Sequence, residues 1–210
     1  MPPKVEEVGD VLFIDGIYIA RKACVLICCD RKHVLGWYLC RNEHSGAWRP
    51  LMSRISEPEV VVSDGGSGFA KALKSTWKNT KHQRCIFHVF CQVRRYTAHK
   101  PKTAAGIKLY SLAKDLFYIN SKEESKEWVD RVLHRVLEYQ EFLYQKSRDE
   151  YGSLRYIHER LIKAKKPINR LLRENTMFTY PDDKLRMEFE IPAINKCYRR
   201  RDKPTTKENS

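Results

Sequence analysis

The chain has 210 residues and lacks any run of eighteen apolar residues, which a membrane-spanning helix requires. Its first ten residues, MPPKVEEVGD, are acidic and lack the apolar segment of a signal peptide. Internal repeats and low-complexity stretches are also absent. With 42% hydrophobic residues, the composition is that of a globular protein. We therefore expect a cytoplasmic protein with one α/β core and no membrane partner.

Cysteine pairing is the second feature that the sequence lacks. The seven cysteines are an odd number, and Cys24, Cys28 and Cys29 lie in or beside an apolar run rather than at spacings typical of a disulfide framework. We expect them to be reduced and buried as small hydrophobic side chains.

Acidic residues are scarce relative to basic ones, 26 against 40, which gives a net charge of +14. Residues 89–210 hold 27 of the 40 basic residues and 17 of the 26 acidic ones, so this half carries +10 of the charge. The excess favours a polyanionic partner, and nucleic acid is the commonest. A solvated basic face is the alternative interpretation.

Three closely spaced runs of β-branched and aromatic residues predict an antiparallel meander, and a short, wholly apolar run predicts a fourth, buried strand. The next apolar run is either a fifth strand or the start of a helix. Beyond residue 90, apolar residues recur at spacings of three and four, which predicts helices and no further strand. The expected strands cover residues 11–20, 23–29, 33–40, 59–66 and 82–89, and the expected helices cover 49–55, 68–77, 109–119, 126–145 and 153–175.

Two aspartates occupy unusual positions in these strands. Asp15 interrupts the apolar run VLFIDGIYI, and Asp64 lies near the end of VVVSDGG. A charged side chain in an apolar strand is costly unless something compensates it, and two converging carboxylates repel unless a cation lies between them. Gly16 and Gly65, which follow them, allow backbone or ligand to approach closely. An ordinary Asp-Gly turn remains the alternative at Asp64.

The segments FIDGIYI, VVVSDGGSGFAKAL and RCIFHVFCQVRRY occur in this order and resemble the core of bacterial Mutator-type insertion-sequence transposases, over most of residues 8–195. These are DDE recombinases, so the resemblance implies an RNase H-like mixed sheet with a helical insertion after the fifth strand. It further implies that Asp15 and Asp64 are the first two catalytic carboxylates, and that they hold two Mg²⁺ or Mn²⁺ ions for phosphoryl transfer.

The same resemblance places a Cys-x-x-His motif at Cys85 and His88, with His88 near the catalytic site. Without a second ligand pair nearby, a zinc site is not expected, and a core cysteine and histidine are the alternative. Arg94 and Arg95 follow and are candidates for DNA phosphate contacts, with a solvated helix face as the alternative. We interpret the four tryptophans as core residues: Trp37, Trp48, Trp77 and Trp128.

The third carboxylate of the family lies in a Thr-Asn-x-x-Glu segment, expected here after EIPA. The sequence at that place is instead INKCYRRRDKPTTKENS. Reading the possible codons one base out of frame restores such a segment, which favours a truncated and frameshifted C-terminus; Glu190 is then only a weak substitute. The expected organisation is the first part of the catalytic core in residues 1–90, a helical insertion in 91–190, and an aberrant basic tail in 191–210.

We therefore predict a transposase of Mutator type that cuts and joins DNA at insertion-sequence ends, inactive or impaired because the third carboxylate is missing. The intact protein is expected to be a homo-oligomer associated with the bacterial nucleoid. The alternative is a non-catalytic DNA-binding remnant that interferes with intact transposase.

Overall fold

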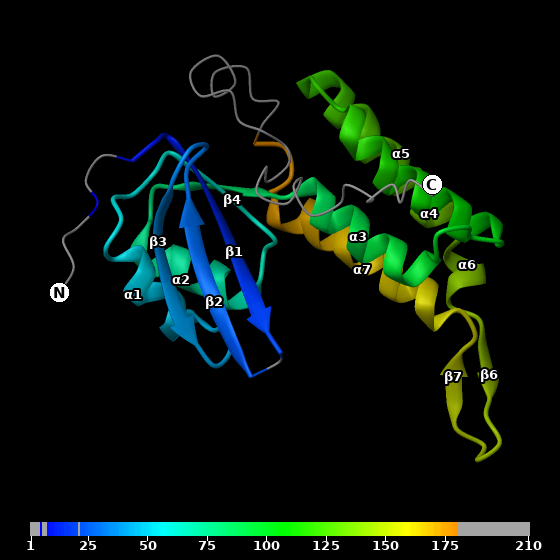
Figure 1. Ribbon diagram of the computed structural model, residues 1–210. Coiled ribbons are helices and arrows are strands. Elements are labelled where there is room, and N and C mark those ends of the chain that lie inside the picture. Colours follow the sequence, from blue (N-terminus) through cyan, green and yellow to red (C-terminus); the bar gives the residue numbers. More distant parts are fainter. Residues whose placement is uncertain (1–4, 6–7, 21, 180–210) are drawn as a thin grey trace, which may run out of the picture. The chain divides into compact units, whose positions relative to one another are not determined.

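The computed structural model describes residue 5 and residues 8–20 and 22–179 of the chain. They form two compact units, one extending to Lys81 and the other beginning at His82, and we describe each by itself (Figure 1). Glu190 and the predicted tail 191–210 lie outside the described residues.

A five-stranded sheet with the order β3-β2-β1-β4-β5 is the basis of the fold. The long strand β1 pairs antiparallel with β2 and parallel with β4, and β2 pairs antiparallel with β3. The predicted α/β, RNase H-like mixed sheet is thus confirmed, including the antiparallel meander at its start. The strands are β1 (Val11–Ile19), β2 (Ala23–Cys29), β3 (Val34–Cys40), β4 (Val60–Ser63) and β5 (Lys81–Arg84).

Helices α1 (Ser45–Met52) and α2 (Ser67–Thr76) belong to the same unit as the first four strands. They form a core cluster with alternate side chains of the sheet, among them Leu12 and Leu26, because residues two apart along a strand share a face. Trp48 meets Phe69 of α2 edge to face, with ring centroids 5.4 Å apart. Burial of this sheet face therefore fixes α1 and α2 against β1 and β2.

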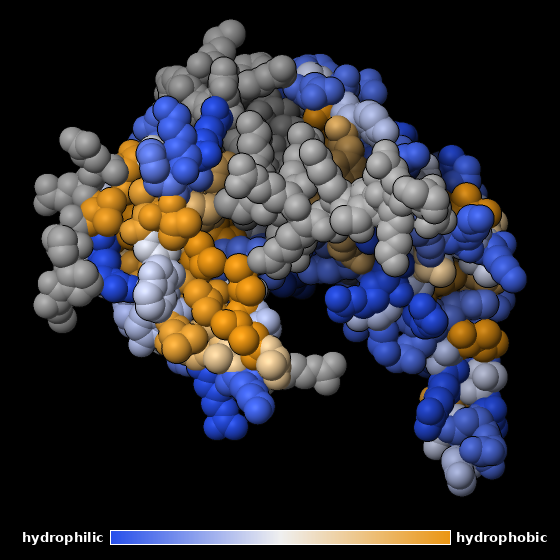
Figure 2. Space-filling view, viewed as in Figure 1, coloured by the Kyte–Doolittle hydropathy of each residue, from blue (hydrophilic) through white to orange (hydrophobic). Residues whose placement is uncertain are grey.

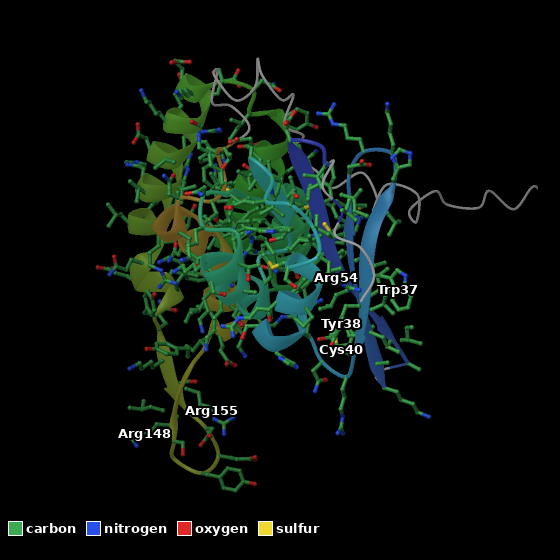
Figure 3. All side chains as sticks on the ribbon, turned by 90° about the vertical axis from the view of Figure 1, so that its left-hand side faces the viewer. Trp37, Tyr38, Cys40, Arg54, Arg148 and Arg155 are labelled. Carbon is green, nitrogen blue, oxygen red and sulfur yellow. The ribbon has the colours of Figure 1, made fainter. Side chains whose placement is uncertain are left out.

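The other face of the meander carries exposed apolar side chains, visible as the orange surface over β1, β2 and β3 in Figure 2. Trp37 lies on this face and is 63% exposed, so the prediction of a core residue at this position was wrong. Its backbone carbonyl accepts a hydrogen bond from Arg54, and Figure 3 labels both residues. Trp48, Trp77 and Trp128 are buried, as are Cys24, Cys28 and Cys29.

The second unit is mainly helical, as the periodicity predicted. Helix α3 packs against α7, which ends at Asn175 in the left-handed conformation that favours helix termination. Helix α4 packs against α5, and the indole Nε1 of Trp128 in α5 donates a hydrogen bond to the Leu112 carbonyl, 2.9 Å away. Its helices are α3 (Ile86–Thr97), α4 (Ala104–Asp115), the 3₁₀ turn η1 (Leu116–Tyr118), α5 (Lys122–Glu138), α6 (Gln140–Leu143) and α7 (Glu159–Glu174).

A β-hairpin interrupts this helical unit, although no strand was expected there. Strands β6 (Lys146–Arg148) and β7 (Leu154–Tyr156) pair antiparallel, and every one of their residues is exposed. Within the hairpin, Arg155 forms an ion pair of 2.7 Å with Asp149, and Arg148 donates to the Gly152 carbonyl (Figure 3). In the described part of the chain, no helix combines the length and apolar character that crossing a bilayer requires.

Candidate active site

Asp15 lies within β1, and Asp64 is the first residue after β4, the parallel neighbour of β1. Phe13 of β1 is opposite Val62 of β4, and each aspartate lies two residues further along its chain. Two residues along a strand return the side chain to the same face, so Asp15 projects from the face that Phe13 occupies. The parallel register therefore brings the two predicted carboxylates to one edge region, where β4 ends and β1 continues.

The backbone beside each aspartate holds one of its carboxylate oxygens. The Gly16 N–H donates to Asp15 Oδ1 at 2.9 Å, and the Gly66 N–H donates to Asp64 Oδ1 at 2.8 Å. Gly65 has a φ of +75°, a conformation that L side chains rarely adopt, which explains why glycine follows Asp64. Helix α2 begins directly after this turn, so the turn connects β4 to α2. Both aspartates are half-buried.

A third carboxylate, which sequence reasoning missed, lies beside this pair. Glu43 belongs to the loop between β3 and α1 and approaches both Gly16 and Gly66. A Cβ built on Gly16 would lie 2.7 Å from Glu43 Oε2, and one built on Gly66 would lie 3.0 Å from Glu43 Oε1. The Trp48 Nε1–H donates to Glu43 Oε1 at 3.2 Å. In the sequence, the glycines next to the two aspartates indicated that another group approaches closely, but they did not identify that group as Glu43.

The environment of Glu43 disfavours its charge. Partial burial raises the pKa of the Glu43 carboxyl, repulsion from Asp64 raises this pKa further, and Asp15 contributes in the same direction. The hydrogen bond from Trp48 acts in the opposite direction. The same acidic surroundings affect a neighbouring thiol: burial, then the nearby Cys40 and Glu43, raise the pKa of Cys24 to about 11. The carboxyl groups of Asp15, Glu43 and Asp64 therefore interact electrostatically.

The donor atoms at the site fit a hydrated Mg²⁺ or Mn²⁺ ion. Asp15 and Asp64 present carboxylate oxygens, which hard divalent cations prefer, and such ions usually take one or two carboxylates together with water and substrate oxygens. No cluster of three or more His, Cys, Asp and Glu side chains among the described residues is arranged to hold a metal ion. An ion held by the two aspartates would thus keep several positions for water and phosphate.

The remaining predicted residues belong to α3 in the second unit. Cys85 is fully buried at the N-terminal end of α3, and His88 is half-buried one turn later. Arg94 lies over the Phe90 ring, 5.4 Å from its centroid, whereas Arg95 is exposed and its carbonyl accepts a hydrogen bond from Arg160 of α7. Burial favours a structural role for Cys85, and exposure leaves Arg95 accessible to a ligand.

Comparison with known proteins identifies the family. The model of the Mutator family of transposases matches residues 11–174, a range that contains both aspartates. The chain is 30% identical over 95 residues to the transposase of insertion sequence element IS905 of Lactococcus lactis, covering 38% of this chain and 24% of that protein. It is 27% identical over 109 residues to a probable insertion-sequence transposase of Corynebacterium diphtheriae, covering 46% of this chain and 32% of that protein.

A third relative, the transposase of IS6120 of Mycolicibacterium smegmatis, is 28% identical over 123 residues, covering 50% of this chain and 38% of that protein. The chain thus spans less than two fifths of the length of each of these relatives. The matched range covers most of the chain and includes every element from β1 to α7. The chain belongs to the Mutator family of transposases.

Proposed function

We propose that this chain contains part of the catalytic core of an insertion-sequence transposase, and that Asp15 and Asp64 are two of its catalytic carboxylates. The observation that carries the proposal is the parallel register of β1 and β4, in which both aspartates lie two residues beyond the Phe13–Val62 pair. Two half-buried carboxylates held at one level of a sheet provide what a divalent cation needs.

The reaction in this proposal is cleavage of a DNA strand at the end of the element, followed by transfer of the strand to a target. Two Mg²⁺ or Mn²⁺ ions at such a site supply charge stabilisation to the attacking and leaving oxygens. Asp15 and Asp64 would hold the cations, and the N–H groups of Gly16 and Gly66 donate to their Oδ1 atoms and so fix the two carboxylates. Half-burial of both aspartates limits the water around them and strengthens their attraction for a cation.

DNA is the proposed partner, and the basic residues of the second unit support this. The exposed Arg95 lies beside Arg160 on the surface formed by α3 and α7, which suits contact with phosphates. His88, one turn into α3, is the proposed neighbour of the catalytic site, whereas Cys85 packs in the core. We also propose that the protein acts in the bacterial cytoplasm at the nucleoid, as a homo-oligomer when intact.

We further propose that this chain alone cleaves DNA weakly or not at all. The residues after Ala193 read INKCYRRRDKPTTKENS and do not contain the Thr-Asn-x-x-Glu segment that the family resemblance implies. In this proposal residues 1–90 supply the first part of the core, residues 91–190 the helical insertion, and residues 191–210 an aberrant tail.

Cleavage of a supercoiled plasmid carrying the ends of the element tests these proposals. We expect DNA binding that weakens steeply with salt, and nicking that is slow with Mg²⁺ or Mn²⁺. Asp15→Asn and Asp64→Asn should each abolish residual nicking, whereas the control Asp10→Asn, at an exposed position before β1, should not. Nicking that survives both aspartate substitutions would refute the assigned site. Robust cleavage that depends on both aspartates would support the assigned site and refute only the proposal that this chain cleaves DNA weakly or not at all.

A further inference from the structure

Two glycines beside the catalytic aspartates face the same carboxylate. Gly16 follows Asp15 in β1, and Gly66 ends the turn that carries Asp64. The place where each would have a Cβ lies 3.0 Å or less from an oxygen of Glu43, closer than real Cβ atoms tolerate without a shift. The absence of side chains at both positions therefore makes room for the carboxylate of Glu43, which lies between β1 and the Asp64 turn.

The first helix of the fold holds this carboxylate in place. Trp48 of α1 is 1% exposed and packs in the core, and its indole N–H donates to Glu43 Oε1 at 3.2 Å. The backbone N–H of Glu43 lies 3.4 Å from the hydroxyl of Tyr18 in β1, to which it donates. The backbone of His44, the next residue, approaches Gly68 of α2 to within 2.8 Å of its would-be Cβ. Glu43 is thus connected to β1, α1 and α2.

Glu43 reaches Asp15 from the opposite face of β1 and approaches Asp64 at Gly66. Adjacent residues of a strand point to opposite faces, and Gly16 faces Glu43, so the side chain of Asp15 leaves β1 on the other face. On the Asp64 side, Glu43 Oε1 and Asp64 Oδ1 both lie within 3.4 Å of the would-be Cβ of Gly66. Glu43 therefore occupies the space beside the glycines that adjoin the two aspartates.

We propose that Glu43 is a positioning residue of the acidic site. Its carboxylate, held by Trp48, is the spacer that sets the Asp64 turn against β1 and so fixes the distance between the two aspartates. The proposal rests on the function proposed above, because it assigns to Glu43 an effect on the cation that Asp15 and Asp64 bind. Groups that orient metal ligands from behind commonly change metal affinity about tenfold or more when they are lost.

Binding of Mn²⁺ to the full chain, measured by the electron paramagnetic resonance of free Mn²⁺, tests the proposal without an activity assay. Glu43→Ala removes the spacer and should weaken Mn²⁺ binding about tenfold. Glu43→Gln keeps the shape of the side chain and an oxygen that accepts from Trp48. Its Mn²⁺ affinity should therefore stay within about threefold of that of the parent, as expected for loss of one partly solvated charge. Unchanged affinity in Glu43→Ala, or an equal loss in both variants, would overturn the positioning role.

The control for a merely structural effect is Glu57→Ala. Glu57 also accepts backbone hydrogen bonds, from Asn79 and Thr80, but it belongs to the loop before β4. This variant should lower the melting temperature and leave Mn²⁺ affinity unchanged. If it lowers the affinity as much as Glu43→Ala does, the effect reports stability and the proposal fails.

Gly16→Ala provides a second route that leaves Glu43 in place, which keeps the test valid if Glu43→Ala does not fold. The new methyl would collide with Glu43 Oε2, and Cys24 Sγ, 3.4 Å away, limits its room on the other side. Gly16→Ala should therefore weaken Mn²⁺ binding. In the background of Glu43→Ala the same methyl has space and should cost nothing more, so the two effects are not additive. Full affinity in Gly16→Ala would overturn the proposal.

The double variant Asp15→Asn, Asp64→Asn separates this inference from the proposed function. If the parent chain binds Mn²⁺ no more tightly than the double variant, the cation site itself is refuted, whatever Glu43 does. If the double variant loses binding and the Glu43 and Gly16 variants do not, the site stands and only the positioning role is refuted.

Discussion

Replacement of Glu43 by glutamine should stabilise the protein at neutral pH. The pKa of the Glu43 carboxyl is raised, first by burial and then by Asp64, so the folded state disfavours its charge. A carboxyl whose folded-state pKa exceeds its unfolded-state value costs stability when it is ionised, and the cost disappears as the pH falls through the folded-state pKa. Glutamine has no charge and still offers an oxygen to the indole of Trp48.

The magnitude follows from the contacts at Gly66. Glu43 Oε1 and Asp64 Oδ1 lie 3.0 and 3.4 Å from one point, the would-be Cβ of that glycine. The two charges are therefore separated by no more than about 6.5 Å, and at the effective dielectric constant of a partly solvated site their repulsion, after solvent screening, is about 1 kcal/mol. For a chain of this size, about 1 kcal/mol corresponds to a rise of about 2–4 °C in melting temperature.

Urea denaturation of the parent and Glu43→Gln at pH 7.5 and at pH 4 measures both sign and pH dependence. The variant should be more stable at pH 7.5, and the difference should shrink at pH 4, where the Glu43 carboxyl becomes protonated. Glu59→Gln, at an exposed position, is the matched control and should change little at either pH. A variant less stable than the parent at pH 7.5, or a difference that does not depend on pH, would refute this electrostatic reasoning.

Three further predictions concern the remainder of the fold. Trp128→Phe should lower the free energy of unfolding by about 1–3 kcal/mol in urea titrations, because the buried Leu112 carbonyl loses its indole donor; an unchanged value would contradict this. Burial raises the pKa of Cys24 to about 11 and that of Cys28 to about 12. At pH 8, iodoacetamide should therefore label both thiols at least about a hundredfold more slowly in the folded chain than in urea, as measured by mass spectrometry. Equal labelling rates would contradict this, because they would show that the thiols are accessible in the folded chain. Ser121→Ala should cost about 1 kcal/mol of stability in urea titrations, because the serine hydroxyl accepts a hydrogen bond from the Glu124 N–H in the first turn of α5, and Ser121→Asn should restore it.

The sheet was predictable because its strands carry strong local signals. Runs such as ACVLICC are too apolar to form exposed turns, and the short links between them favour antiparallel neighbours. The aspartates were conspicuous for the same reason, since Asp15 interrupts an otherwise apolar strand. Their arrangement in one row required the parallel register of β1 and β4, which no local pattern specifies.

The hairpin and Trp37 were missed for a different physical reason. Strands β6 and β7 have three residues each, all exposed, so neither shows the alternation that marks a half-buried strand. Instead, the apolar residues of SLRYI were in phase with those of α7 and were interpreted as part of that helix. Trp37 has the hydrophobicity of a core residue, but whether a sheet face is covered depends on the packing of other elements.

Glu43 shows why a site can be incomplete when it is inferred from spacing alone. Its segment, RNEHSGAW, reads as a polar turn before a short helix, and nothing in it distinguishes Glu43 from a solvated acid. Its position depends on Trp48, five residues later, which the hydrophobic core fixes against Phe69. Gly16 and Gly66 are consistent with this position of Glu43, because the absence of a Cβ at each leaves space that the Glu43 carboxylate occupies. Residue types thus pointed to the two aspartates, whereas the glutamate beside them could be found only once the core had placed α1.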